Sequence, residues 1–596
     1  MYKRFLLAVF AVFISYLSFA QRISYELSMP KPQSHYFRVQ VNLSDFKEET
    51  LVVKMPVWAP GSYLVREFAK NVDLVKAFDE NNKPIKVTKT TKNAWSIAKG
   101  KAKQIRVNYE VYAFELSVRT SFLDLSHGFV SGSGVFMYVD NYKDRSGTLE
   151  VVPHASFKKV TTSLPAAKES VQKDGSFDFS FDNYDQLVDC PIEIGNQEVF
   201  SFDAAGVNHT VAIYGIGNHQ IATLKQDMAH MVETATAVFG ENPNKQYTFI
   251  IHNVVDGQGG LEHSNSCTLS VNRWTYEGEE YKGFLSLVAH EYFHLWNVKR
   301  IRPIELGPFN YDEENYTTLL WVMEGFTSYY DELLLRRAGI YTKDEYLRKI
   351  EGTINYVENA VGSRVQPVAH ASFDAWIKGY RPNENSANTG MTYYSRGQML
   401  AALIDAKIIA NSKGTKCLDH FLQHLYKTFY KEQNRGFSEM EFKQELASFL
   451  NEDMDDFYAR YIDGTEVAPI KSVFEKIGVD VSQLNTIRPS FGATIRQENG
   501  KALVKGIRAN SAAEDCGLSV NDEVIGCDGF RMEGADLDSY ISSIPDGQSF
   551  TLLVARNELY FELKATMGTT ERMQFTLRFG QDKNLQKLHD YWLRTQ

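Results

Sequence analysis

Short runs of alternating apolar and polar residues fill the first part of the chain, from Ile23 to about Tyr142. Such alternation is typical of strands that have one buried and one exposed face. The runs include HYFRVQVNL, TLVVKMPV and QIRVNYEVYAF, and turn-prone stretches such as DENNKP separate them. Two further runs, GTLEVVP and SFDFSF, continue the pattern towards Asp189. We therefore expect an N-terminal antiparallel β-sandwich over residues 21–200.

The hydrophobic pattern then changes to that of a mixed domain. HTVAIYG and QYTFIIHNVV are predicted to be buried strands, and from Gly283 onward apolar residues recur at helical spacing, as in GFLSLVAHEYFHLWNV and TTLLWVMEGFTSYYDELLLRRAG. After Thr465 short strands return, separated by glycine-containing turns. The expected fold is a multidomain α+β protein with a second domain over residues 201–465 and a small third domain over residues 466–596.

The first residues have the features of a signal peptide, which we expect to span residues 1–20. Lys3 and Arg4 precede a short apolar run, and small residues follow it at Ser18-Phe19-Ala20. The alternative is an uncleaved anchor, but the run is short for a membrane span. No later segment has ~18 uninterrupted apolar residues, so the mature chain is expected to be exported, to the periplasm or the medium, without a membrane span.

Charge and cysteine content narrow the function classes. The formal net charge is −10 and no basic run is concentrated anywhere, so a nucleic acid partner is not expected. The five cysteines are scattered along the chain, which does not resemble a disulfide framework. Because their number is odd, disulfides within one chain would leave at least one thiol unpaired.

The stretch LVAHEYFHLWNVKR, residues 287–300, carries the clearest chemistry in the chain. His290 and His294 lie four residues apart in a predicted helix, so both imidazoles can reach one metal ion from the same face. Glu291 lies beside them, where a carboxylate can take a proton from a water molecule at the metal. We expect this helix to be buried because it is apolar almost all round.

A third metal ligand is expected on the next helix. Glu324 stands in the otherwise apolar stretch LLWVMEGFTSYYDELLLRR, where an ionised carboxylate would be costly without a cation. The alternative is a partly exposed glutamate at a helix edge. Asp331 lies two turns further on the same face; it either orients a ligand histidine or is simply a solvated aspartate.

Several motifs together resemble the glycyl aminopeptidase family of gluzincin zinc metallopeptidases. They are HEYFHLWNVKRIRP, WVMEGFTSYYDE, WAPGSYLVREF at residues 58–68 and GGLEHSNS at residues 259–266. The resemblance implies a β-rich N-terminal domain, a thermolysin-like α+β catalytic domain and a C-terminal PDZ-like domain. It also implies one Zn²⁺ ion per chain and a preference for peptides that begin with glycine or alanine.

The resemblance also implies roles for three further residues. GGLEH is similar to the strand in which zinc aminopeptidases hold the free α-amine of the substrate, which assigns this role to Glu262, with Gly260 beside it. The related enzymes have Gly-x-Met-Glu-Asn where this chain has Gly260-Leu261-Glu262-His263. TYYSRGQML is similar to the segment that supplies a tyrosine hydroxyl to the tetrahedral intermediate, which favours Tyr394, followed by Tyr393.

The C-terminal stretch GKALVKGIRANSAAEDCGLSVNDEVIGCDG resembles a bacterial PDZ domain. Such domains add an extended peptide to a sheet edge and hold its carboxylate in backbone N–H groups. Two positions depart from the pattern, Ser511-Ala512-Ala513 and the loop Ser490-Phe491-Gly492-Ala493. A peptide ligand and a purely packing role therefore both stay open for this domain.

Together these features predict an exported zinc aminopeptidase that acts on peptides with a free N-terminus. His290, His294 and Glu324 would hold the metal, Glu291 would act as base, Tyr394 would stabilise the oxyanion and Glu262 would bind the amine. Two alternatives are a zinc endopeptidase of the same fold and a scaffold that binds peptides without cleaving them.

Overall fold

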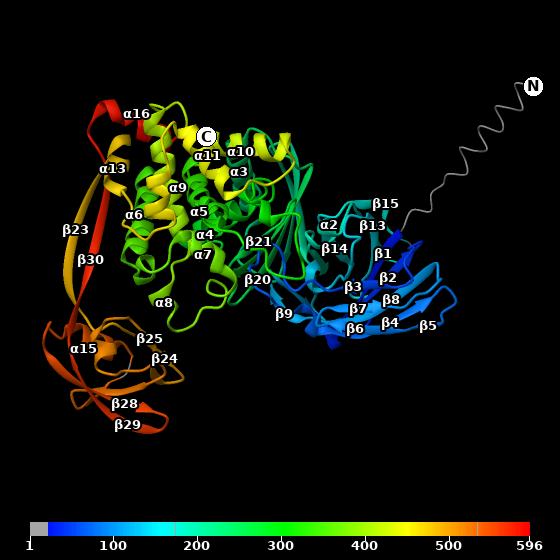
Figure 1. Ribbon diagram of the computed structural model, residues 1–596, viewed down its shortest axis with the longest axis horizontal. Helices are drawn as coiled ribbons and strands as arrows, with labels where there is room; N and C mark the ends of the chain where they lie inside the picture. Colours follow the sequence, from blue (N-terminus) through cyan, green and yellow to red (C-terminus); the bar gives the residue numbers. More distant parts are fainter. Residues whose placement is uncertain (1–21, 173–174, 533, 596) are drawn as a thin grey trace, which may run out of the picture.

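The computed structural model describes residues 22–172, 175–532 and 534–595. The predicted signal peptide, residues 1–20, lies outside the described residues. Three hydrophobic cores lie in a β-rich N-terminal part, a helix-rich middle and a small C-terminal part, so the predicted multidomain order is confirmed at this coarse level. In Figure 1 the N-terminal part (blue) and the C-terminal part (orange and red) lie on either side of the helix-rich middle part. Within the described ranges, no helix is both long and apolar enough to cross a membrane.

The N-terminal part contains three sheets around one apolar core. The largest has eight strands in the order β15-β16-β13-β1-β2-β8-β4-β5: Ala166–Val171, Phe177–Phe181, Gly147–Val152, Arg22–Ser28, Tyr36–Ser44, Gln104–Tyr112, Val72–Asp79 and Pro84–Ile85. A five-stranded sheet, β14-β17-β11-β10-β9, is formed by Lys159–Thr162, Ile192–Gly195, Gly128–Val130, Thr120–Leu123 and Phe114–Ser117. The third, β12-β3-β7-β6, is formed by Tyr138–Val139, Leu51–Lys54, Ala94–Ile97 and Val87–Thr91.

One strand pair corrects the expectation of a purely antiparallel sandwich. β1 and β13 pair in parallel, with Ile23 opposite Gly147. A parallel pair needs a long crossover, which the many residues between these strands provide. Alternation along a strand shows which face is buried but carries no information about the direction of its neighbour, so this pairing was not predictable from the pattern.

The middle part places helices against one mixed sheet. The sheet order is β18-β19-β20-β22-β21, formed by Glu198–Ala204, Val207–Tyr214, Gln246–Val254, Ser266–Asn272 and Gly260–Glu262. β19, β20 and β22 are parallel, whereas β21 is an antiparallel strand at the edge. The longer helices are α3 Ile221–Phe239, α4 Gly278–Phe293, α5 Leu320–Arg337, α6 Lys343–Asn359, α9 Tyr393–Asn411 and α11 Glu439–Leu450. α5 is buried almost all round, as its apolar sequence predicts.

The motif at residues 58–68 connects the first two parts. Val57, Trp58 and Tyr63 belong to the core of the middle part although they follow strand β3. The Trp58 indole N–H donates to the carbonyl of Asn310 at 2.8 Å. This anchoring brings Gly61 to the edge strand β21, where the site is built.

The C-terminal part is connected to the middle by a long two-stranded ribbon, β23 Val479–Ser490 and β30 Gly568–Phe579. The chain segment that connects β23 to β30 forms the C-terminal sheet and helix α15 Gly534–Ser543. The strands of this sheet are β24 Ala493–Glu498, β25 Lys501–Ile507, β26 Glu523–Cys527, β28 Ser549–Arg556 and β29 Leu559–Thr566. In Figure 1 this sheet and α15 lie below the helices of the middle part. After β30, α16 Lys583–Trp592 packs on the middle part again, and the Trp592 indole donates to the Tyr329 hydroxyl at 2.7 Å.

Candidate active site

Helix α4 presents His290 and Glu291 in its last turn, and His294 is the residue that caps it. The predicted helix extended to Val298, but α4 ends at Phe293. The His294 N–H still reaches the His290 carbonyl at 3.3 Å, so the two imidazoles keep their helical spacing. Beyond it the backbone turns, and Val298 adopts a φ of 125°, which a helix does not allow. The change leaves the predicted pair of histidines in place.

The two histidines converge on Glu324, which helix α5 supplies. The Nε2 atoms of His290 and His294 lie 3.5 and 3.2 Å from the same oxygen, Oε2 of Glu324. The ligand atoms of these three residues all lie within 4.8 Å of one another. We call the three residues the His-His-Glu cluster. Two imidazole nitrogens and one carboxylate oxygen are a donor set that zinc commonly takes in enzymes.

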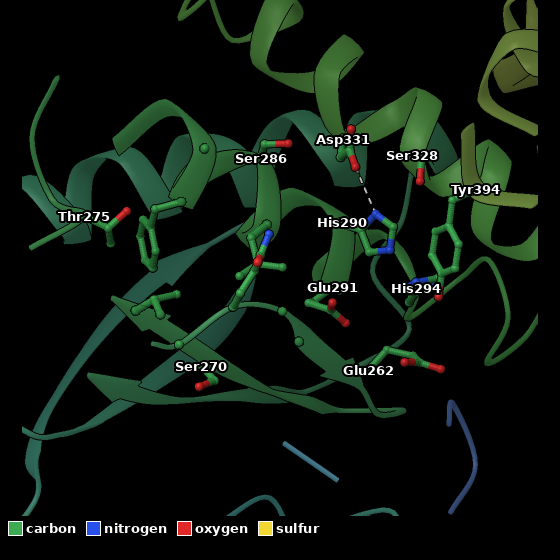
Figure 2. Close-up of a pocket in the computed structure, with 18 of the residues that line it drawn as sticks. Glu262, Ser270, Thr275, Ser286, His290, Glu291, His294, Ser328, Asp331 and Tyr394 are labelled. Carbon is green, nitrogen blue, oxygen red and sulfur yellow. Dashed lines mark hydrogen bonds and ion pairs between the residues drawn. The ribbon is translucent and has the colours of Figure 1, made fainter. Parts of the chain in front are cut away.

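A second layer of side chains orients the cluster. The Asp331 carboxylate lies 2.9 Å from His290 Nδ1, at the position predicted two turns beyond Glu324 (Figure 2). His294 Nδ1 lies 2.7 Å from the carbonyl oxygen of Asn297. The Asn297 amide in turn donates to the carbonyls of Val322 and Met323 at 3.0 and 2.9 Å. Both rings are therefore held with Nε2 towards Glu324, an arrangement typical of metal-binding histidines.

The electrostatics of the His-His-Glu cluster favour the binding of a cation. Burial alone would lower the pKa of His290, but hydrogen bonds to Asp331 and Glu324 raise it well above its ordinary value. Burial likewise opposes the charge on Glu324, but the nearby imidazoles, His294 first, hold the pKa of Glu324 well below its usual range. The site thus attracts positive charge, and a divalent ion would replace the protons of the two imidazoles. The residues present fit a zinc ion.

Glu291 lies next to the cluster and against strand β21. Its carboxylate is 4% exposed, and Oε2 has no hydrogen-bond partner. Burial raises the pKa of Glu291 to about 7, although the His290 and His294 imidazoles oppose the shift. A Cβ on Gly260 would lie 2.3 Å from Glu291 Oε1, so only glycine allows strand and helix to approach so closely. This explains why position 260, which was predicted to lie beside Glu262 in the substrate site, is a glycine.

Glu262 lies two residues further along β21 and is also buried, at 4% exposure. Its Oε1 atom has no hydrogen-bond partner among the residues that the structure describes. Gly61 from the N-terminal part covers it, and a Cβ there would lie 2.5 Å from that oxygen. Gly61 also has a φ of +85°, which disfavours any other residue. A buried carboxylate that lacks a partner is costly, and a cationic ligand would supply one.

The structure distinguishes the two tyrosines considered for the oxyanion. Tyr394 lines the same cavity as Glu262 and Glu291, and its ring stacks on His290 with centroids 6.3 Å apart. Tyr393 is 3% exposed and is not among the residues that line the cavity. Burial raises the pKa of Tyr394 well above its ordinary value, so its hydroxyl keeps its proton. Tyr394 is thus the tyrosine that can donate a hydrogen bond in the cavity.

The cavity has a volume of about 590 Å³ and extends along α4 and the edge of the sheet. Figure 2 shows Glu262 and Tyr394 near one end, Glu291 between, and Thr275 far from them at the other end. Gly61 and Arg119 of the N-terminal part also line it. The cavity therefore lies where two parts of the chain meet, with the histidines, Glu291 and Glu262 all facing it.

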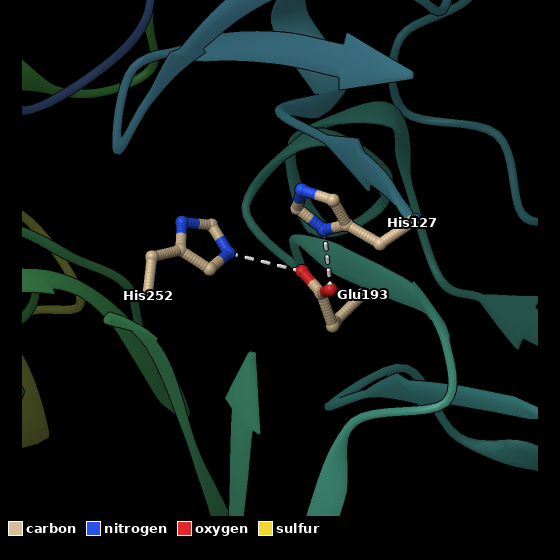
Figure 3. Close-up of side chains that lie close together, drawn as sticks. All are labelled: His127, Glu193 and His252. Carbon is tan, nitrogen blue, oxygen red and sulfur yellow. Dashed lines mark hydrogen bonds and ion pairs between the residues drawn. The ribbon is translucent and has the colours of Figure 1, made fainter. Parts of the chain in front are cut away.

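Sequence reasoning missed a second buried cluster, which we call the interdomain triad: His127, Glu193 and His252 (Figure 3). His127 Nδ1 and His252 Nε2 contact different oxygens of Glu193, at 2.7 and 3.0 Å. These are ordinary hydrogen-bond lengths, whereas both histidines of the His-His-Glu cluster face one oxygen at longer range. The triad is thus a hydrogen-bonded bridge that joins the residue before β11 and strand β17 of the N-terminal part to β20 of the middle part.

Replacing Glu193 by alanine is expected to lower the thermal unfolding midpoint by several degrees. All three side chains of the interdomain triad are at most 1% exposed, and breaking a buried charged network costs about 3–5 kcal/mol. Scanning calorimetry measures the effect. The control is Glu198→Ala, which breaks a glutamate–histidine contact to His219 whose glutamate side chain is 47% exposed. Equal shifts for both variants would contradict a stabilising role of the triad.

Asn297, Arg119 and the interdomain triad were not predicted because no local spacing signals them. Asn297 stands in the motif HEYFHLWNVKR, but it lies beyond the end of α4, where helical spacing does not predict which side chains meet. The triad residues come from a turn and two strands that are far apart in the sequence. Asp331, by contrast, has a local signal, since it shares a helix face with Glu324.

Two family models match the chain. The model of the Peptidase M61 N-terminal domain matches residues 24–196, and that of the M61 glycyl aminopeptidase matches residues 283–400. A comparison with curated proteins found no match.

Among solved structures, the aminopeptidase N family protein from Idiomarina loihiensis is 29% identical, with a TM-score of 0.89 over 95% of this chain and 99% of that one. An M1 zinc metallopeptidase from Deinococcus radiodurans is 15% identical, with a TM-score of 0.50 over 75% of this chain and 95% of that one. The second likeness shows a shared fold. Another structure of that metallopeptidase contains a bound Tyr-Ser-Ala substrate.

Fold, cavity and donor set define a class of protein, the zinc metallo-aminopeptidases, which hydrolyse peptides. Within this class, residues 24–196 match the N-terminal domain and residues 283–400 match the glycyl aminopeptidase domain of Peptidase M61, which confirms the predicted resemblance. The segment beyond residue 400, which includes the whole C-terminal part, lies outside both matched regions.

Proposed function

We propose that the protein removes the N-terminal residue from peptides and that one zinc ion per chain is held by His290, His294 and Glu324. The observation that supports this most directly is the convergence of these three side chains next to a second buried carboxylate, Glu262, that has an oxygen without a partner. A zinc ion held there would supply a Lewis acid that polarises the substrate carbonyl and makes a water molecule more acidic.

Glu291 is the proposed general base. Its buried carboxylate adjoins the cluster, and its raised pKa suits a group that accepts a proton near neutral pH. It takes a proton from the attacking water and delivers it to the leaving amine. Gly260 allows β21 to lie against this carboxylate, so the scissile bond can approach Glu291 closely.

Tyr394 is proposed to stabilise the developing oxyanion. Replacing it by phenylalanine is expected to lower kcat about 10²- to 10³-fold, as loss of one oxyanion donor does elsewhere. Steady-state kinetics on a glycine anilide measures the effect. Tyr393→Phe is the matched control, because its hydroxyl is buried without a partner and lies outside the cavity lining. A larger loss for Tyr393→Phe would reverse the assignment.

Glu262 is proposed to bind the α-ammonium group of the substrate. An ammonium ion gives its carboxylate the charged partner that the protein does not provide, and such charge-assisted bonds are strong in buried sites. Because Gly61 covers Glu262, the chain leaves little room for residues that would precede the first one of the substrate. This arrangement favours an aminopeptidase over the alternative of an endopeptidase.

A comparison of free and acetylated substrates tests the proposed function. Glu262→Ala is expected to lower kcat/KM about 10- to 100-fold for a glycine anilide, because an ammonium–carboxylate contact is lost. The N-acetylated anilide should be a poor substrate for both proteins. Glu280→Ala is the control, since Glu280 lines the same cavity without belonging to the proposed site. Efficient cleavage of the acetylated substrate by the wild type would instead support an endopeptidase.

Substrate preference and location complete the proposal. The family description, glycyl aminopeptidase, supports glycine at the N-terminus of the substrate, and alanine is included in the proposal because the motif resemblance implies it. The composition of residues 1–20 supports export to the periplasm or the medium.

The C-terminal part is proposed to be a PDZ-like domain. β24 is the edge strand of its sheet and lies against helix α15, so the strand edge is a place where an extended peptide could add. The loop Ser490–Ala493 leads into β24, which is the position of the carboxylate-binding loop in the PDZ domains that this part resembles. The Asn388 amide of the middle part donates to the Ile507 carbonyl of the C-terminal part at 2.7 Å. Such contacts support a packing role for this domain as much as the open strand edge supports peptide binding.

A further inference from the structure

Arg119 enters the catalytic cavity from the N-terminal part, in the turn between β9 and β10. Its Nη2 atom donates to the carbonyl of Gly260 at 3.2 Å. Its Nε atom is buried without a hydrogen-bond partner, and Arg119 forms no ion pair with any residue in the described ranges. A guanidinium group has five N–H donors, so most of its binding capacity is free for a ligand.

The carbonyl that Arg119 contacts faces the open edge of strand β21. The Gly259 carbonyl accepts from Ser270 and the His263 N–H donates to Ser266, both at 2.9 Å, so these residues face strand β22. Hydrogen-bonding groups alternate along a strand, so the backbone groups of Gly260 and Glu262 face outward. A substrate peptide in extended conformation that forms backbone hydrogen bonds with this edge would therefore lie next to Arg119.

The two ends of the open edge carry opposite charges. Glu262 offers an unpaired carboxylate oxygen, whereas Arg119, beside Gly260, offers a guanidinium group. Successive strand residues rise by ~3.3 Å, so groups two residues apart are separated by roughly 6.6 Å. That is about the length of two residues of an extended peptide. A dipeptide with both termini free has charges of matching sign at about this spacing.

We propose that Arg119 binds the α-carboxylate of short peptide substrates and so makes the enzyme selective for dipeptides with a free C-terminus. This inference rests on the proposed function, because Glu262 must hold the amine for the carboxylate to reach Arg119. A planar guanidinium group binds a carboxylate through two parallel hydrogen bonds, which neither lysine nor glutamine can do. Arg119 is a specificity-determining residue here, and it takes no part in the bond cleavage.

A comparison of Gly-Phe with its C-terminal amide, Gly-Phe-NH₂, tests this proposal. The wild type is expected to prefer the free acid about 10- to 100-fold in kcat/KM, mainly through KM, as a charge-assisted pair predicts. Arg119→Gln should lower this preference to near one while kcat/KM for the amide changes less than threefold. Arg119→Lys should retain part of it. Arg381→Gln is the control, because Arg381 also donates to one carbonyl, that of Val65 at 3.3 Å, but does not line the cavity.

Three outcomes would overturn the inference. Equal loss of both substrates in Arg119→Gln would show that Arg119 only supports strand β21. An unchanged preference in that variant would place the carboxylate site elsewhere. A preference for Gly-Asp-NH₂ over Gly-Asn-NH₂ that disappears in Arg119→Gln, without an effect on Gly-Phe, would assign Arg119 to an acidic side chain. If the zinc-loaded wild type cleaves none of these peptides, the proposed function itself fails, which is a distinguishable result.

Discussion

Replacing Glu291 by glutamine is expected to lower kcat by roughly 10²- to 10⁴-fold while leaving the zinc content unchanged. Glutamine has nearly the same shape as glutamate, so the close contact with Gly260 is retained. It cannot accept a proton, however, and the transfer from water to the leaving amine is lost. Metal analysis of the purified variant, together with kcat on a glycine anilide, measures both parts of the prediction.

A glutamate on the same helix provides the control. Glu279 lies in the first turn of α4, where its side chain is 83% exposed and contacts Lys282 at 3.0 Å. Glu279→Gln removes an equal charge from the helix, so its kcat should stay within twofold of the wild type. If Glu291→Gln keeps more than a tenth of the activity, Glu291 is not the base. If it loses zinc, Glu291 contributes to metal binding instead.

The parts of the site that lie on two neighbouring helices could be predicted from the sequence. Helical periodicity fixes which residues share a face, so His290 and His294 could be paired, and Asp331 could be placed on the face of Glu324. The structure brings Glu324 and both histidines together through an interface between α4 and α5. Burial of Glu324 followed from the apolar residues around it.

The parts of the site that depend on contact between domains could not be predicted in this way. Gly61 and Arg119 reach the cavity from loops of the N-terminal part, and no sequence period links them to Glu262 or Gly260. The parallel pairing of β1 with β13 could not be predicted either, because it depends on a contact between strands that are far apart in the sequence. These contacts are set by packing of surfaces, which a local pattern of apolar and polar residues does not encode.

Removal of a metal ligand is expected to have a still larger effect than removal of the base. His294→Ala should bind little zinc and should hydrolyse peptides no faster than the chelated wild type, because the Lewis acid and the activated water are lost together. The histidine is 1% exposed and its Nε2 atom lies 3.2 Å from Glu324 Oε2, so its removal leaves the buried cluster with two of its three donors. His230→Ala, on the exposed face of α3, is the control and should retain zinc and activity.

Zinc retention should also depend on pH in a defined direction. Without a cation, the pKa of His290 is raised because hydrogen bonds to Asp331 and Glu324 outweigh burial, so protons compete with the metal for this imidazole. Zinc binds the neutral ring, and its affinity must therefore fall as the pH is lowered towards and below the pKa of His290 in the metal-free protein. Equilibrium dialysis over a series of pH values measures the zinc content directly.

Replacing Asp331 by asparagine removes one of the groups that raise the pKa of His290. It also weakens the orientation of the ring, which typically costs about 10- to 100-fold in metal affinity. The variant should thus bind zinc more weakly at neutral pH but lose it less steeply on acidification. A parallel shift of the whole curve would show that Asp331 orients His290 without affecting its protonation.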